Sequence, residues 1–114
     1  MQQLFYAGDH FLVADSICQG VLQYCRVLGN AGKADVITVP YAETDGTRSS
    51  VHLLVGPASQ IYSVPVRADV PDPEDDRILR WLQDATAKLE PDNHPSPFAD
   101  EAFYDDEWWT VPDL

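Results

Sequence analysis

At 114 residues the chain is long enough for one domain with a single hydrophobic core, and its 45% hydrophobic and 23% charged residues exclude a wholly disordered protein. The formal net charge of −12 lies mainly in the C-terminal part, because residues 1–68 carry −1 and residues 69–114 carry −11. A field of that sign repels phosphate groups. It argues against direct binding to nucleic acid or to an anionic membrane, and it favours a basic protein partner.

The N-terminal part of the chain predicts a hairpin followed by a helix. Two short apolar runs flank residues 8–10, which have the composition of a tight turn. Asp15 or Ser16 is a suitable N-cap for a helix that Gly29-Asn30 and Gly32 are expected to end. The apolar stripe of this helix consists of Ile17, Cys18, Val21, Leu22, Tyr24, Cys25 and Leu28.

The middle of the chain predicts three strands. Residues 34–42, 50–55 and 60–66 have the β-branched and aromatic character of strands, and turn residues separate them. Short connections favour antiparallel pairing. These residues therefore predict a three-stranded antiparallel meander.

A second helix is predicted before Pro91. Asp72 is a suitable N-cap, and Pro73 suits the first helical position. The acidic residues around them lie at the positive end of the helix dipole, which explains their charge without a function. The apolar stripe consists of Ile78, Leu79, Leu82, Ala85 and Leu89.

The predicted elements follow the order ββαβββα. We therefore expect an α+β fold with a mostly antiparallel sheet of about five strands and two helices. A single domain is expected over residues 1–90, followed by an acidic, aromatic C-terminal arm over residues 91–114. The element order over roughly residues 4–89 resembles the longin and roadblock class of small domains. This resemblance of topology implies a role in pairing or scaffolding.

The C-terminal arm combines acidity with large rings. From Glu90 to Leu114 there are eight carboxylates and no Lys or Arg. Aromatic rings favour burial, and Trp and Tyr are preferred anchors at interfaces. The alternative is that the rings pack back across the sheet or helix of their own domain. The residues predicted to bind a partner are Phe98, Phe103, Tyr104, Asp105, Asp106, Glu107, Trp108 and Trp109.

The usual motifs of catalysis and cofactor binding are missing, so we expect no enzyme, no cofactor and no metal site. The sequence has no glycine-rich phosphate loop, Gly-x-Ser-x-Gly elbow, His-Glu-x-x-His or Cys-x-x-Cys. His10, His52 and His94 fit no metal-ligand spacing, and His52 is expected to be a half-buried packing residue. Ser59 lies in a predicted turn without an identifiable base, so its expected role is structural.

The N-terminus lacks the basic and long apolar regions of a signal peptide, and no window approaches eighteen apolar residues. We therefore expect a cytoplasmic protein. Cys18 and Cys25 share the apolar face of the first predicted helix, too far apart along it for a disulfide. They are expected to be buried, unreactive free thiols.

Together these features predict a small acidic protein-binding module, such as an inhibitor, an immunity-type protein or an adaptor, that engages a partner through the arm. Two alternatives stay open. The chain could be a self-associating structural protein, a homodimer in which each arm clasps the other subunit. It could also be an acidic decoy for a nucleic-acid-binding protein, with carboxylates in place of phosphates.

Overall fold

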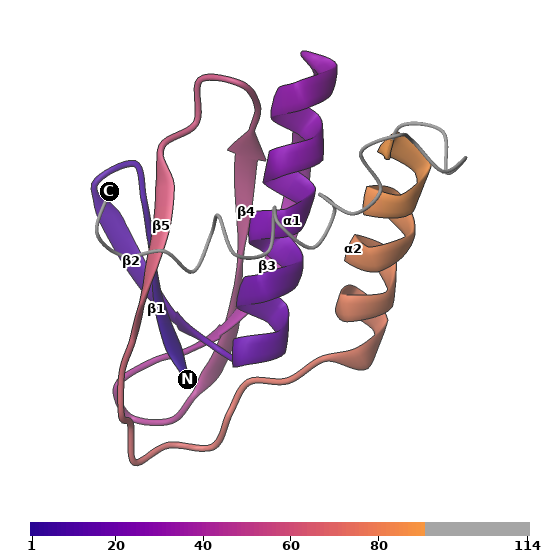
Figure 1. Cartoon of the computed structure of the whole chain (residues 1–114). Coiled ribbons are helices and arrows are strands. Elements are labelled where there is room, and N and C mark those ends of the chain that lie inside the picture. Colours follow the sequence, from indigo (N-terminus) through magenta and orange to yellow (C-terminus); the bar gives the residue numbers. More distant parts are fainter. Residues whose placement is uncertain (91–114) are drawn as a thin grey trace.

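Five strands and two helices follow one another in the predicted order ββαβββα, which confirms the α+β fold (Figure 1). The structure is a computed structural model, and it describes residues 1–90. The elements are β1 (Gln2–Tyr6), β2 (Asp9–Val13), α1 (Asp15–Ala31), β3 (Asp35–Ala42), β4 (Arg48–Val55), β5 (Ile61–Pro65) and α2 (Asp76–Leu89).

The strands form one antiparallel sheet in the order β4-β3-β2-β1-β5. The predicted meander is therefore wrong in one pairing, because β5 pairs with β1 and not with β4. The sheet curls so strongly that residues 56–60 link its two edge strands. At this end the Tyr6 hydroxyl from β1 donates a hydrogen bond to the Leu54 carbonyl of β4 and lies 3.2 Å from Ser59 Oγ.

The β1–β2 turn lies one residue earlier than predicted. Ala7 and Gly8 form it, both with positive φ, while Asp9 and His10 belong to β2. A two-residue turn with positive φ at both positions matches the right-handed twist of the strands. Alanine rarely adopts this conformation, so composition did not reveal it as a turn residue.

Helix α1 begins without the predicted side-chain cap. Its N-cap is Ala14, and the Asp15 carboxylate instead forms an ion pair with the N-terminal amine of Met1 at 2.9 Å. At the other end Gly32 takes the left-handed conformation, with φ of 66°, and its N–H bonds to the Gly29 and Leu28 carbonyls. Gly32 belongs to the predicted ending, whereas Gly29 and Asn30, which were also expected to end the helix, lie within its last turn.

Helix α2 begins at Asp76, later than predicted. Asp75 is the N-cap, and its carboxylate accepts hydrogen bonds from Arg77 N at 3.0 Å and Ile78 N at 3.2 Å. Pro73 is instead a buried residue of the preceding loop. The predicted cap at Asp72 was wrong because several consecutive acids could serve, and the choice depends on where the chain meets the core.

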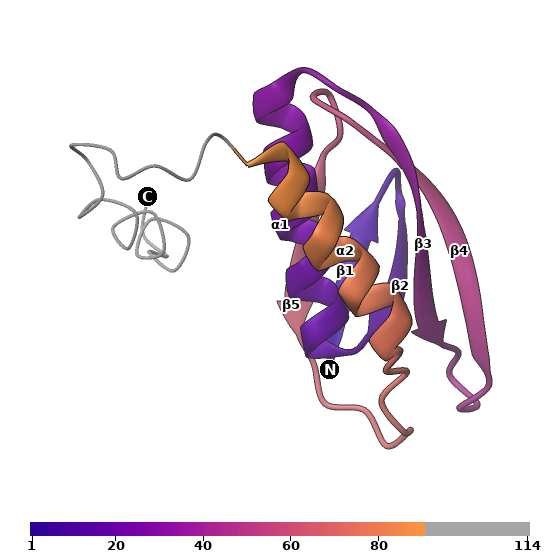
Figure 2. The ribbon, with the colours of Figure 1, turned by 90° about the vertical axis from the view of Figure 1, so that its right-hand side faces the viewer.

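Both helices lie on the concave side of the sheet, and α2 packs mainly against α1 (Figures 1 and 2). A Cβ at Gly20 of α1 would lie 3.3 Å from Leu82 Cδ1, so a larger residue there would push α2 away. Neither helix within residues 1–90 is long and apolar enough to cross a membrane. The fully buried side chains include Leu4, Val13, Ile17, Val21, Leu28, Ile37, Val39, Val55 and Leu82.

The two cysteines are free thiols on α1, as predicted. Cys18 is fully buried, whereas Cys25 is only half-buried. Burial raises the pKa of both thiols, and that of Cys25 to about 11. A raised pKa keeps both groups protonated near neutral pH, so neither has the character of a reactive thiolate.

A hydrogen bond between Tyr24 and Asp35 ties α1 to β3. The Tyr24 hydroxyl donates to Asp35 Oδ2 at 2.5 Å. Burial raises the pKa of Tyr24 to about 12 from its ordinary value of 10.0, and the Asp35 carboxylate adds to the shift.

This shift predicts a loss of stability in alkali. The pKa of Tyr24 is higher in the folded protein than in the unfolded chain, so its contribution is fully present below pH 10 and is lost as the pH rises toward 12. Urea unfolding between pH 8 and pH 12 should show this fall for the wild type. Tyr24→Phe lacks the hydroxyl and should show a shallower fall; an identical pH profile for both proteins would contradict the assignment.

Candidate functional site

Three rings form a row across one end of the sheet. Phe5 of β1 lies between Tyr62 of β5 and His10 of β2, because the strand register places both opposite it. The Phe5 and Tyr62 rings stack with centroids 4.7 Å apart and planes 8° apart. The His10 ring centroid lies 5.5 Å from that of Phe5. Stacked rings of this kind hold one another in fixed positions.

A second row extends this apolar surface. Gln3 lies beside Phe5 on the same side of β1, opposite Leu12 and Val64. Gln3 Nε2 is 2.7 Å from His10 Nδ1, and this contact fixes the orientation of the imidazole. The resulting surface, called the aromatic face below, consists of Gln3, Phe5, His10, Leu12, Tyr62 and Val64.

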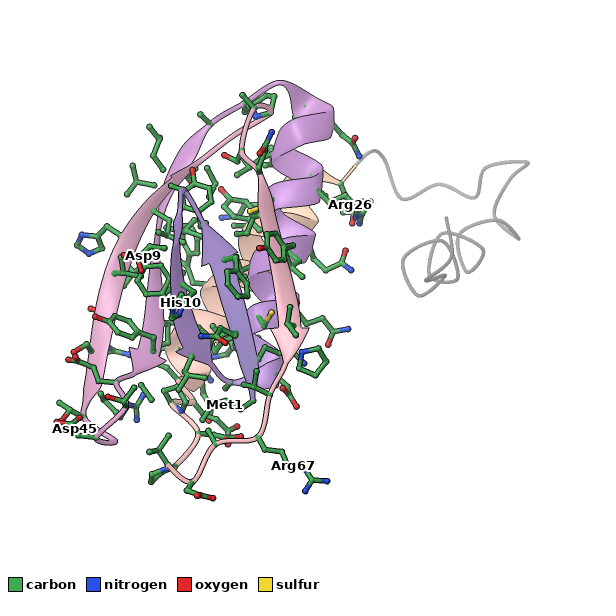
Figure 3. The ribbon with its side chains drawn as sticks, turned by 90° about the vertical axis from the view of Figure 1, so that its left-hand side faces the viewer. Met1, Asp9, His10, Arg26, Asp45 and Arg67 are labelled. Carbon is green, nitrogen blue, oxygen red and sulfur yellow. The ribbon has the colours of Figure 1, made fainter. Side chains whose placement is uncertain are left out.

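The aromatic face lies on the side of the sheet opposite the helices. Successive strand residues point to opposite sides, so Leu4 enters the core while its neighbours Gln3 and Phe5 point away from it. Tyr62 is 59% exposed and Val64 is 43% exposed, because nothing between residues 1 and 90 covers this side. Figure 3 views the molecule from this side, with His10 labelled near the middle.

Within residues 1–90 the strands place no carboxylate on the outer side of the sheet, although the chain is strongly acidic. The two acidic strand residues, Asp9 and Asp35, occupy positions that alternate with the outward ones. A partner can therefore cover the six residues of the aromatic face without desolvating a carboxylate among them, a desolvation that would oppose binding; the nearest acidic strand residue is Asp9, at the β1–β2 turn.

A hollow of about 620 Å³ adjoins the aromatic face at the β1–β2 turn. The turn and the β4–β5 loop form its walls. The rings of Phe5, His10 and Tyr62 line it together with Tyr6 and Ser59, and Asp9 is the one charged residue in its lining. Concave apolar surfaces with a few polar groups are typical places for an anchoring side chain.

Ser59 has the structural role that its turn position predicts. Its Oγ accepts a hydrogen bond from Gly56 N at 2.9 Å and lies near the Tyr6 hydroxyl. His52 is exposed on β4, so its interpretation as a half-buried packing residue was wrong. His94 lies outside the part of the chain that the structure describes. Within that part no group of His, Cys, Asp or Glu has the geometry of a metal site.

All the residues that the sequence predicts to bind a partner lie outside residues 1–90. They are Phe98, Phe103, Tyr104, Asp105, Asp106, Glu107, Trp108 and Trp109. Their role stays a prediction. Sequence reasoning missed the aromatic face, since its rows form only when β5 pairs with β1. The available signal was the alternation of Gln3 and Phe5 with Leu4, which is typical of a strand with one side outside the core.

Comparison with protein-family models, with curated proteins and with solved structures found no match. The likeness to the longin and roadblock class thus stays a resemblance of element order.

Proposed function

We propose that the chain is a small acidic protein-binding module of the inhibitor, immunity-type or adaptor kind, and that its aromatic face is part of the binding surface. The observation that carries this proposal is the exposed Tyr62 ring stacked on the half-buried Phe5, on a side of the sheet where the strands of residues 1–90 place no carboxylate. Aromatic residues are enriched at the centres of protein interfaces, where they account for much of the binding free energy.

The C-terminal arm supplies the charge in this proposal. Residues 91–114 carry −7 of the net charge of −12. Carboxylates of this density attract a basic partner and speed its association, while apolar anchors slow its dissociation. We therefore propose that a basic protein contacts the aromatic face with its apolar residues and the arm with its lysines or arginines. The free thiols of Cys18 and Cys25 agree with a reducing compartment such as the cytoplasm.

Affinity capture with three forms of the full-length chain tests this function. The wild type is compared with Phe5→Thr/Tyr62→Thr, in which threonine keeps the strand propensity while removing both rings. Trp81→Gln is the matched control, since Trp81 is 47% exposed on α2, away from the aromatic face. Mass spectrometry should detect one basic protein with the wild type and the control but not with the double variant. If every captured protein binds all three forms equally, the aromatic face is not the binding surface.

A further inference from the structure

Strand β4 lies at one edge of the sheet and pairs only with β3. The pairing is continuous over eight residues, from Asp35 opposite Val55 to Ala42 opposite Arg48. One side of β4 therefore has no neighbouring strand within residues 1–90.

The hairpin fixes which backbone groups of β4 point to this open edge. Glu43 N donates to Thr47 O at 2.8 Å, so these two residues form a hydrogen-bonded pair at the turn. Bonded and non-bonded pairs alternate along an antiparallel ladder. Hence the backbone N–H and C=O groups of the odd-numbered residues of β4 bond to β3, and those of the even-numbered residues point to the open edge. The hydrogen bond from the Tyr6 hydroxyl to the Leu54 carbonyl supports this assignment, since Tyr6 approaches from the open edge.

At this open edge the backbone N–H and C=O groups of Ser50 and His52 make no hydrogen bond within residues 1–90. The strand also lacks the features that usually protect an edge, which are proline, bulges, short length and several charges. The opposite edge strand, β5, has five residues and ends in Pro65. In β4 the one charged residue is Arg48, whose guanidinium donates to the Glu74 carbonyl at 2.6 Å.

We propose that β4 pairs with β4 of a second copy of this chain. The two strands run antiparallel about a two-fold axis at Val51, and the two sheets join into one. In this register Ser50 lies opposite His52 of the second copy, and the two residues exchange both backbone hydrogen bonds. Two-fold interfaces are the commonest kind in homo-oligomers.

The composition of β4 favours a second copy as the occupant of the edge. The strand has no carboxylate, so two copies bring no acidic side chains together. Arg48 lies opposite Leu54 of the second copy in this register, so the two cationic groups are not neighbours either. The Leu54 carbonyl already accepts a hydrogen bond from Tyr6, so the backbone pairing between the copies rests on Ser50 and His52. The aromatic face belongs to β5, β1 and β2, toward the other edge of the sheet. The dimer therefore leaves both aromatic faces free, and this inference does not depend on the proposed function.

A proline substitution at the open edge tests the pairing. Ser50→Pro removes an outward N–H without breaking a bond to β3, while Ser50→Ala keeps that N–H. Sedimentation equilibrium of the full-length chain should show a dimer for the wild type and for Ser50→Ala. The dissociation constant of Ser50→Pro should be at least tenfold higher, with circular dichroism confirming its fold. Added salt should strengthen the wild-type dimer, since each copy carries −12. A wild type that is monomeric at every concentration overturns the proposal.

A disulfide trap gives a second test that does not require the proline variant to fold. In the proposed register Val51 faces its own copy in a non-hydrogen-bonded pair, with Cα atoms about 4.5 Å apart, which is within disulfide range. Val51→Cys in a Cys25→Ala background should oxidise to a covalent dimer. Tyr62→Cys in the same background is the control for random collision, because Tyr62 lies on the opposite edge strand. Equal yields of covalent dimer from both variants contradict the pairing, as would a dimer linked through the control alone.

Discussion

Leu28→Ala is expected to lower the free energy of unfolding by about 2 to 5 kcal/mol. Leu28 lies on α1 with 1% of its surface exposed, among the side chains that join this helix to the sheet. Removing its branched end forfeits buried apolar area and leaves a cavity that the close-packed surroundings refill only in part.

Leu54→Ala is the matched control for this experiment. The substitution removes the same atoms from a leucine that is 63% exposed on β4. Urea unfolding followed by circular dichroism should show a loss for the control within about 0.5 kcal/mol, as for other exposed positions. Comparable losses for both variants would mean that α1 does not contribute to the core as described.

The helices could be predicted from the sequence because their information is local. The apolar stripe of α1 includes Ile17, Val21 and Leu28, and all three are buried as predicted. That of α2 places Leu82 in the core. Boundaries were less certain where several residues could serve, as in the acidic run that contains Asp75.

The pairing of the strands could not be read in the same way. Whether β5 joins β4 or β1 depends on how far the sheet curls, and this is a property of the whole sheet. The aromatic face could not be predicted from the sequence for the same reason. Phe5 and Tyr62 are far apart in the sequence and stack only because their strands are neighbours. The arm, in contrast, attracts attention through composition alone, and its role stays a prediction.

Tyr62→Thr is expected to weaken binding of the captured partner by about 2 kcal/mol or more, which corresponds to about a thirtyfold higher Kd. The ring is largely exposed in the free protein and stacks on Phe5, so a partner that covers it gains apolar area without reorganising the face. Because the side chain is outside the core, the free energy of unfolding should change little. Binding and stability are thus expected to respond separately.

Isothermal titration of the partner into the wild type, Tyr62→Thr and Trp81→Gln tests the central claim most directly. The account predicts a Kd for Tyr62→Thr about thirtyfold or more above the wild-type value, while Trp81→Gln stays within about twofold of it. Equal affinities for the wild type and Tyr62→Thr would contradict the claim that the aromatic face binds the partner.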